Sequence, residues 1–198
     1  KVRWDDDGSV SDHIDTDEVW AVEREATPPE EVIHIVEAHP AACGLEMEFK
    51  DGGSTKKMLP LQLALDKGAG LQVAIRILEA PDAGSGITKL QCGGKVAGDD
   101  NSERLCASLA AHAPGLTALD LSRNGLTAVP PAVCDIVSLQ TLDLSGNVIA
   151  ELPPGLARLT ELRGLKLREN NRDKSNPALE LAVCIGKEKG VAGIFDLL

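Results

Sequence analysis

Residues 116–138 read LTALDLSRNGLTAVPPAVCDIVS, and residues 139–161 read LQTLDLSGNVIAELPPGLARLTE. The second stretch repeats the first after 23 residues, and the pattern continues into LRGLKLREN at 162–170. Leucine and asparagine keep their places in all three stretches, and a Pro-Pro pair keeps its place in the first two. A period of this length predicts stacked structural units, because one unit of this size cannot bury its own apolar face.

The spacing within each unit predicts what each residue type does. We expect Leu116, Leu119 and Leu121 to point inward from a short strand, and each fully buried leucine contributes roughly 1.5–3 kcal/mol. An asparagine after each strand can pair with backbone groups of neighbouring turns, which predicts structural roles for Asn124, Asn147 and Asn170. The Pro-Pro pairs predict an extended, polyproline-like return path with no helix.

These stretches carry the LxxLxLxxN signature, and residues 116–170 therefore resemble the leucine-rich-repeat family. The resemblance implies an α/β solenoid with a short parallel β-sheet of about four turns and a C-terminal capping helix. We assign residues 86–175 to the repeats and residues 176–198 to the cap. The cap resembles the segment that follows the repeats in Roco-type proteins and in repeat-linked GTPases and kinases.

An earlier and longer turn is predicted at 87–115, where Leu90 precedes Leu119 by 29 residues. Its second part, SERLCASLAAHAPG, has the pattern of an amphipathic helix with Leu105, Leu109 and Cys106 inward. The length and the helix resemble the ribonuclease-inhibitor-like class of repeat. Cys92 is expected in the apolar ridge beside Leu90. Lys95 stands where the later turns have asparagine, so the sequence does not predict an asparagine network of backbone hydrogen bonds for this turn.

The N-terminal half has a different pattern. Residues 57–83 resemble an ankyrin repeat, with LPLQLAL and LQVAIRILEA as its two helices, although Leu59 and Gln62 replace the usual Thr and His. An earlier helix at 30–42 matches the second one after 42 residues, with an insertion around GLEMEFKDGGSTK. We assign ankyrin-like helices to 27–85. Residues 1–26 are assigned to a small, acidic β element that resembles part of an SH3- or Tudor-like barrel.

Charge and cysteine content limit the classes of function. The net charge is −11, and residues 1–31 hold eleven acidic against three basic residues. No basic stripe suits a phosphate backbone, and an aromatic content of 2% argues against base stacking, so we expect no nucleic-acid partner. The five cysteines include no CxxC pair, which predicts reduced and mostly buried thiols. The sequence has neither a signal peptide nor a long apolar run, which predicts no direct membrane insertion.

The groups that could perform chemistry do not form a recognised site. The acidic cluster between Asp5 and Glu18 fails the EF-hand pattern, because Arg3 and Ile14 would stand at ligand positions. The four histidines lack the spacing of a zinc site, and IGKEKG at 185–190 lacks the spacing of a phosphate-binding loop. We therefore expect no catalytic residue, metal, cofactor or small-molecule substrate in this chain.

We expect the outward residues of the predicted strands to form a concave face that binds a protein partner. A face kept polar only for solubility is the alternative, as is contact through the terminal helix or the ankyrin-like helices. The residues assigned to partner binding are Gln91, Asp120, Ser122, Arg123, Gln140, Asp143, Ser145, Arg163, Lys166 and Arg168.

The expected function is a non-enzymatic interaction module or scaffold, and the chain is expected to be a piece of a longer intracellular, cytoplasmic protein. Two alternatives remain open. One is the regulatory arm of a Roco-type GTPase or kinase, and the other is substrate recognition for a ubiquitin ligase or an immune sensor.

Overall fold

The computed structural model of the chain describes residues 20–22, 47–51, 54–66, 71–79 and 84–170. The chain divides into two compact units, residues 1–83 and residues 84–198. The segments expected to hold the acidic β turn, the helix at 30–42 and the C-terminal cap lie outside the described residues.

The first unit contains a three-stranded sheet in the order β1-β2-β3. Strand β1 (Trp20–Val22) pairs in parallel with β2 (Met47–Asp51), which pairs antiparallel with β3 (Ser54–Met58). The insertion expected in the ankyrin-like segment is thus a β-hairpin. The sequence between β2 and β3 is Gly52-Gly53.

Two short helices of the first unit pack against each other, α2 (Pro60–Asp66) and α3 (Leu71–Glu79). Two helices were expected here from the resemblance to an ankyrin repeat, and both helices are present. Helix α2 begins at a proline, whose fixed φ suits a first helical position. The pair buries aliphatic side chains: Leu61, Ala64, Leu65, Ala74, Ile75, Ile77 and Leu78.

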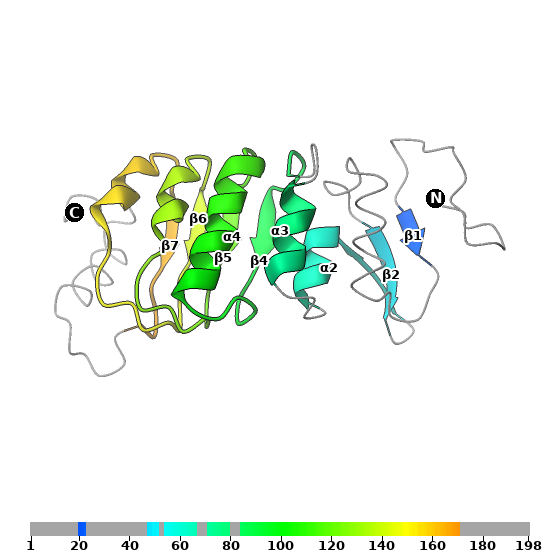
Figure 1. The fold of residues 1–198 in the computed structure, drawn as a ribbon, viewed down its shortest axis with the longest axis horizontal. Coiled ribbons are helices and arrows are strands. Elements are labelled where there is room, and N and C mark those ends of the chain that lie inside the picture. Colours follow the sequence, from blue (N-terminus) through cyan, green and yellow to red (C-terminus); the bar gives the residue numbers. More distant parts are fainter. Residues whose placement is uncertain (1–19, 23–46, 52–53, 67–70, 80–83, 171–198) are drawn as a thin grey trace. The chain divides into compact units, whose positions relative to one another are not determined.

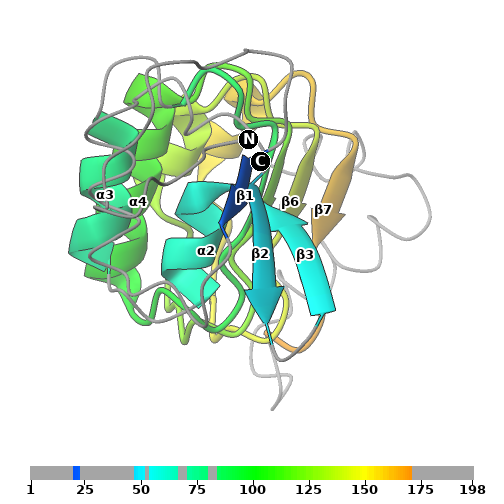
Figure 2. The same ribbon diagram turned by 90° about the vertical axis from the view of Figure 1, so that its right-hand side faces the viewer.

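The second unit is organised by a parallel sheet in the order β4-β5-β6-β7 (Figures 1 and 2). The strands are β4 (Lys89–Gln91), β5 (Ala118–Asp120), β6 (Thr141–Asp143) and β7 (Gly164–Lys166). Their pairing places Leu90 opposite Leu119, Leu119 opposite Leu142, and Leu142 opposite Leu165. The register therefore follows the sequence intervals of 29 and 23 residues, as predicted.

The leucines form one continuous ridge beneath the sheet. Leu116, Leu119 and Leu121 are at most 2% exposed, which confirms the inward orientation expected for them. Their counterparts in the first turn are Ile87, Leu90 and Cys92, which are equally buried. Between residues 84 and 170, which the structure describes, the sequence has no aromatic residue, so the core there is aliphatic. Aliphatic side chains repeated at one height can stack turn upon turn, which accounts for the uniform interval between strands.

The side of the unit opposite the strands is lined by helices. Figure 2 shows α4 (Asp99–His112) on one side and the strands β6 and β7 on the other. The predicted helix is confirmed, with Leu105, Cys106 and Leu109 buried, although it begins three residues earlier than the predicted segment. The later turns have 3-10 helices instead, η2 (Pro131–Asp135) and η3 (Pro154–Arg158), and η2 packs between α4 and η3.

The expectation that the Pro-Pro pairs exclude a helix is wrong. The first proline of each pair is extended, with ψ of 122° at Pro130 and 143° at Pro153, because a following proline disfavours helical backbone. The second proline is the first residue of the 3-10 helix, where its missing N–H costs no hydrogen bond and its fixed φ fits. Each pair therefore determines where the extended chain ends and the helix begins.

Asparagine side chains connect the turns below the strands. The amide nitrogen of Asn147 donates to the carbonyls of Leu121 at 3.0 Å and Leu144 at 2.8 Å. Its oxygen accepts from the backbone N–H groups of Asn124 at 2.9 Å and Leu126 at 3.1 Å. Asn147 thus satisfies four backbone groups in a buried place, three of them in the preceding turn.

Asn124 and Asn170 use the same arrangement. Asn124 donates to the carbonyl of Cys92 at 3.0 Å and accepts from the N–H of Val96 at 2.9 Å, both one turn back. Asn170 donates to Leu144 at 2.8 Å and accepts from Ile149 at 3.1 Å. Each asparagine therefore serves the turn before its own. This explains why Lys95 can stand in place of an asparagine. Its turn is the first of the second unit, so no earlier turn within that unit has backbone groups that need a partner from it.

Acidic residues of α4 connect it to the following turns. The Asp99 carboxylate accepts from the Thr127 N–H at 2.9 Å and from the Thr127 hydroxyl. The Glu103 carboxylate accepts from the Ala132 N–H at 3.1 Å, at the start of η2. The Thr127 hydroxyl lowers the pKa of Asp99, since it bonds the ionised carboxylate. The long first turn is thereby anchored to the shorter second turn.

The substitution Asn147→Ala should destabilise the second unit by ~3 kcal/mol, because it leaves several buried backbone groups without a partner. Hydrogen exchange followed by mass spectrometry on peptides from residues 84–170 measures this loss. The control Val148→Ala changes a neighbouring side chain that is 54% exposed, and should alter the same opening free energy by less than about 0.5 kcal/mol. Equal effects of the two substitutions would contradict the role given to Asn147.

Candidate functional site

The outward side of the β4–β7 sheet, called here the strand face, holds the residues expected to bind a partner. Strand pairing places Gln91, Asp120, Asp143 and Lys166 opposite one another, in a single row across the four strands. Ser122, Ser145 and Arg168 follow the strands two residues later. Gln140 and Arg163 adjoin at the strand starts, where the Arg163 N–H donates to the Gln140 carbonyl at 2.8 Å. Four of the ten predicted residues therefore lie in the strands of one sheet, namely Gln91, Asp120, Asp143 and Lys166. The other six lie within three residues of a strand end: Ser122, Arg123, Gln140, Ser145, Arg163 and Arg168.

The two aspartates of this row are tied to their own backbone. The Asp120 carboxylate accepts from the Ser122 N–H at 2.8 Å, and the Asp143 carboxylate accepts from the Ser145 N–H at 3.0 Å. An aspartate that bonds a backbone N–H two residues ahead stabilises a local turn. Both aspartates therefore have a structural function at the strand ends.

Lys166 forms an ion pair with Asp143. Its ammonium nitrogen lies 2.8 Å from the Asp143 carboxylate, with the lysine side chain 61% exposed and the aspartate side chain 18% exposed. Residues 143 and 166 differ by one repeat, so this ion pair crosses from β6 to β7. The pair connects the last two strands of the strand face.

The environment of Asp143 shifts its pKa. Partial burial raises the pKa of Asp143, but hydrogen bonds from Lys166 and Ser145 and the positive charge of Lys166 together leave it below its ordinary value. The hydrogen bond to Asp143 in turn raises the pKa of Lys166. A carboxyl whose folded pKa is lower than its unfolded pKa stabilises the fold above the unfolded pKa. That contribution disappears as the pH falls through the folded pKa.

The Arg123 side chain lies against Gly146, which is in the next repeat. The Arg123 backbone has φ of 57°, and a Cβ placed on Gly146 would come within 2.9 Å of the Arg123 Cγ. The Gly146 N–H donates to the Arg168 carbonyl at 2.8 Å, so Gly146 lies between the two arginines. Glycine at 146 therefore leaves room for the Arg123 Cγ, which a Cβ at this position would crowd.

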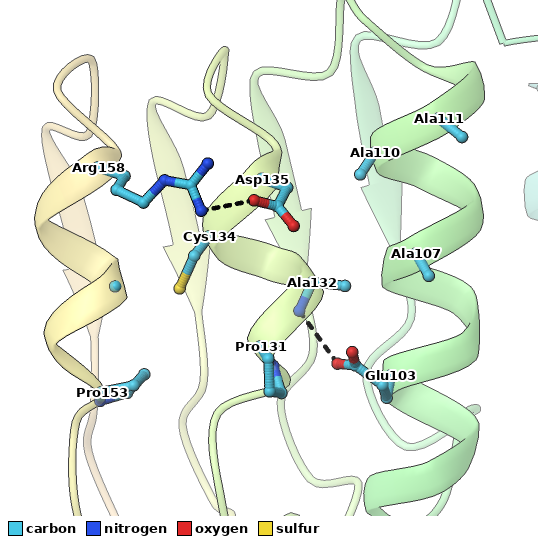
Figure 3. Close-up of a pocket in the computed structure, with 11 residues that line it drawn as sticks. Glu103, Ala107, Ala110, Ala111, Pro131, Ala132, Cys134, Asp135, Pro153 and Arg158 are labelled. Atoms are coloured by element: carbon cyan, nitrogen blue, oxygen red, sulfur yellow. Dashed lines mark hydrogen bonds and ion pairs between the residues drawn. The ribbon is translucent and has the colours of Figure 1, made fainter.

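The opposite side of the unit has a hollow of about 690 Å³, called here the helix-side groove (Figure 3). Small side chains of α4, η2 and η3 line it, among them Ala107, Ala132 and Gly155. Charged groups lie along it: Glu103 caps the start of η2, and Arg158 forms an ion pair with Asp135 at 2.8 Å. The groove forms where the long α4 gives way to the shorter 3-10 helices.

The repeat pattern of the sequence does not predict this groove. The pattern that could have indicated it is the set of small residues on one side of α4, Ala107, Ala110 and Ala111, at helical spacing. Cys134 also borders the groove, and burial raises its pKa, which makes it a poor nucleophile. Cys92, Cys106 and Cys134 are free and buried, as expected for structural thiols.

Residues 114–172 match a family model described as leucine rich repeat. This segment is similar to leucine-rich repeats. It covers β5, β6 and β7 with both 3-10 helices, and the register of the sheet extends the repeat pattern back to β4. A comparison with curated proteins gave no match to the chain.

Leucine-rich repeats are in general protein-binding elements and are typically not enzymes. Among the described residues, no three His, Cys, Asp or Glu side chains are grouped so that they could hold a metal ion. A search of the same residues found no helix with the length and apolar character needed to cross a membrane.

Replacing Lys166 with methionine should raise the pKa of Asp143, because the substitution removes both the hydrogen bond and the charge that hold it down. A pH titration of the Asp143 carboxyl carbon by NMR measures the change directly. The control Lys89→Met removes a cation from β4, at the other side of the sheet, and should leave the titration in place. An unchanged Asp143 titration in Lys166→Met would show that the ion pair is absent in solution.

Proposed function

We propose that this chain is a non-enzymatic protein-interaction module, and that its leucine-rich repeats bind a protein partner through the strand face. A scaffold or subunit of a larger assembly is the role that this proposal implies. The observation that supports it most is the row of polar side chains that the strand register aligns across four strands.

The strand face has the properties of a preorganised surface. Its backbone is held by ladder hydrogen bonds between strands and by the asparagine contacts beneath the strand ends. Its ion pair between Asp143 and Lys166 and its aspartate turns order several side chains before a partner arrives. A surface ordered in advance loses less conformational entropy on binding, which favours affinity.

The helix-side groove is the competing surface. It is lined largely by alanine, proline and glycine, and its Arg158 and Asp135 already neutralise each other. Small side chains offer little contact area, and interface hot spots are enriched in Trp, Tyr and Arg. The strand face holds three arginines and is therefore favoured over the groove.

The proposal extends to the other parts of the chain. We propose ankyrin-like helices at 27–85, a capping helix at 176–198, and an intracellular location. The regulatory arm of a Roco-type GTPase or kinase, and substrate recognition for a ubiquitin ligase or an immune sensor, are narrower versions of this role. The sequence of the full gene beyond Leu198 distinguishes them, because a GxxxxGKS or GxxxxGKT segment there would favour the GTPase.

A photoreactive amino acid placed at Ser145 should form a covalent adduct with a protein partner in cells. The same amino acid at Ala107, which is exposed and lines the helix-side groove, is the matched control. Gel shifts and mass spectrometry of the adducts identify what each position contacts. Adducts from Ala107 alone would reject the strand face in favour of the groove, and their absence from both positions would reject the proposed function.

A further inference from the structure

The part of the strand face nearest β7 is rich in positive charge, although the chain as a whole carries −11. Four cationic side chains occur there, called here the cationic edge: Arg123, Arg163, Lys166 and Arg168. Three of them belong to β7 or its flanks, and all four are exposed. The neighbouring acidic residues are Asp120 and Asp143, which are only partly exposed, and Glu161 and Glu169, which flank β7 and are exposed.

Of the four cations of this edge, only Lys166 has an ion-pair partner among the described residues. Lys166 is neutralised by Asp143 at 2.8 Å, and the carboxylates of Asp120 and Asp143 accept hydrogen bonds from backbone N–H groups of their own turns. Within the ranges that the structure describes, no carboxylate forms an ion pair with Arg123, Arg163 or Arg168. Three guanidinium groups therefore face outward with donors to spare.

The arrangement favours close approach of these groups. Lys166 and Arg168 lie on the same side of the chain, because both are exposed and Leu167 between them is buried. The Cγ of Arg123 lies against Gly146, whose N–H donates to the Arg168 carbonyl at 2.8 Å. From residue 163 to residue 168 the chain spans about 17 Å if it is extended, so five or so residues of an extended ligand could follow it.

We propose that the cationic edge binds an acidic, extended segment of a protein partner, with carboxylates of that segment held by Arg123, Arg163 and Arg168. Guanidinium groups match carboxylates in a planar, two-bonded geometry, which distinguishes arginine from lysine as a recognition residue. This proposal rests on the proposed function, because it names the partner chemistry for the same face.

Other polyanions are less compatible with the same surface. A nucleic acid would bring phosphates against Asp120 and Asp143 as well as against the arginines, and the described residues of the face offer no aromatic side chain for its bases. An acidic peptide can place neutral residues opposite the two aspartates. Charge complementarity therefore selects a peptide with spaced carboxylates.

The test uses the 198-residue chain and a fluorescein-labelled peptide of four Ser-Glu pairs, read by fluorescence anisotropy in 50 mM salt. The double substitution Arg163→Gln, Arg168→Gln should weaken binding of this peptide about tenfold or more, since each exposed charge pair contributes modestly. The matched control Arg104→Gln, Arg158→Gln removes the same charge from helical segments of the unit, and should change the affinity less than about twofold. Equal weakening by both variants would overturn the proposal.

A glycine pair provides a second comparison that does not remove charge. Gly146→Ala and Gly125→Ala both place a Cβ on a backbone with φ of 70°, but only the first meets Arg123. Weaker peptide binding by Gly146→Ala than by Gly125→Ala supports the proposal, and equal binding contradicts the part assigned to Arg123. Since both changes impose the same backbone strain, the comparison holds even if each loses stability.

Further probes separate this proposal from its rivals and from the proposed function. The proposal of an acidic partner segment would be overturned by tighter binding of either of two probes than of the Ser-Glu peptide. These probes are a deoxythymidine oligonucleotide of the same charge and a peptide of residues 1–18. Loss of affinity between 50 mM and 500 mM salt is expected, because salt screens exposed charge pairs. If the acidic probe does not bind while Ser145 still gives adducts in cells, the inference fails and the proposed function stands.

Discussion

Each turn of the second unit must bury backbone N–H and C=O groups where the chain leaves its strand, and the structure depends on how these groups are satisfied. An unpaired buried group costs about as much as a lost hydrogen bond, so a stack of such turns cannot persist without partners for them. Asn124, Asn147 and Asn170 supply those partners, each mainly for the turn before its own. The leucine ridge provides apolar burial, but the asparagines determine that the turns stack in one register.

The same constraint places the outward residues. Because the strands cannot slip against one another without breaking the asparagine contacts, residues at equal positions in successive repeats form rows across the sheet. One such row carries Asp120, Asp143 and Lys166, and the ion pair between the last two results directly from it. The strand face is therefore a consequence of the buried network beneath it.

Repetition explains how much could be predicted from the sequence. The ridge of Leu119 and Leu142, the helix with Leu105 and Leu109, and the sheet register all follow from an interval that the sequence displays. The Pro-Pro pairs were misinterpreted because proline excludes only the helix interior, and the second proline of each pair is well suited to a first helical residue. Contacts between repeats were also missed, such as Arg123 over Gly146, since they depend on side-chain direction. A clue existed in the change from Arg123 to Gly146 at equivalent positions of consecutive repeats.

The central claim is that an acidic segment of a protein partner docks on the strand face near β7. The most direct measurement is an amide chemical-shift map of the isotope-labelled 198-residue chain, recorded by NMR as the acidic Ser-Glu peptide is added. The account predicts shifts that concentrate in residues 140–146 and 163–169 and leave 103–111 and 131–135 unchanged. Shifts confined to those helical segments, which line the groove on the opposite side, would contradict it.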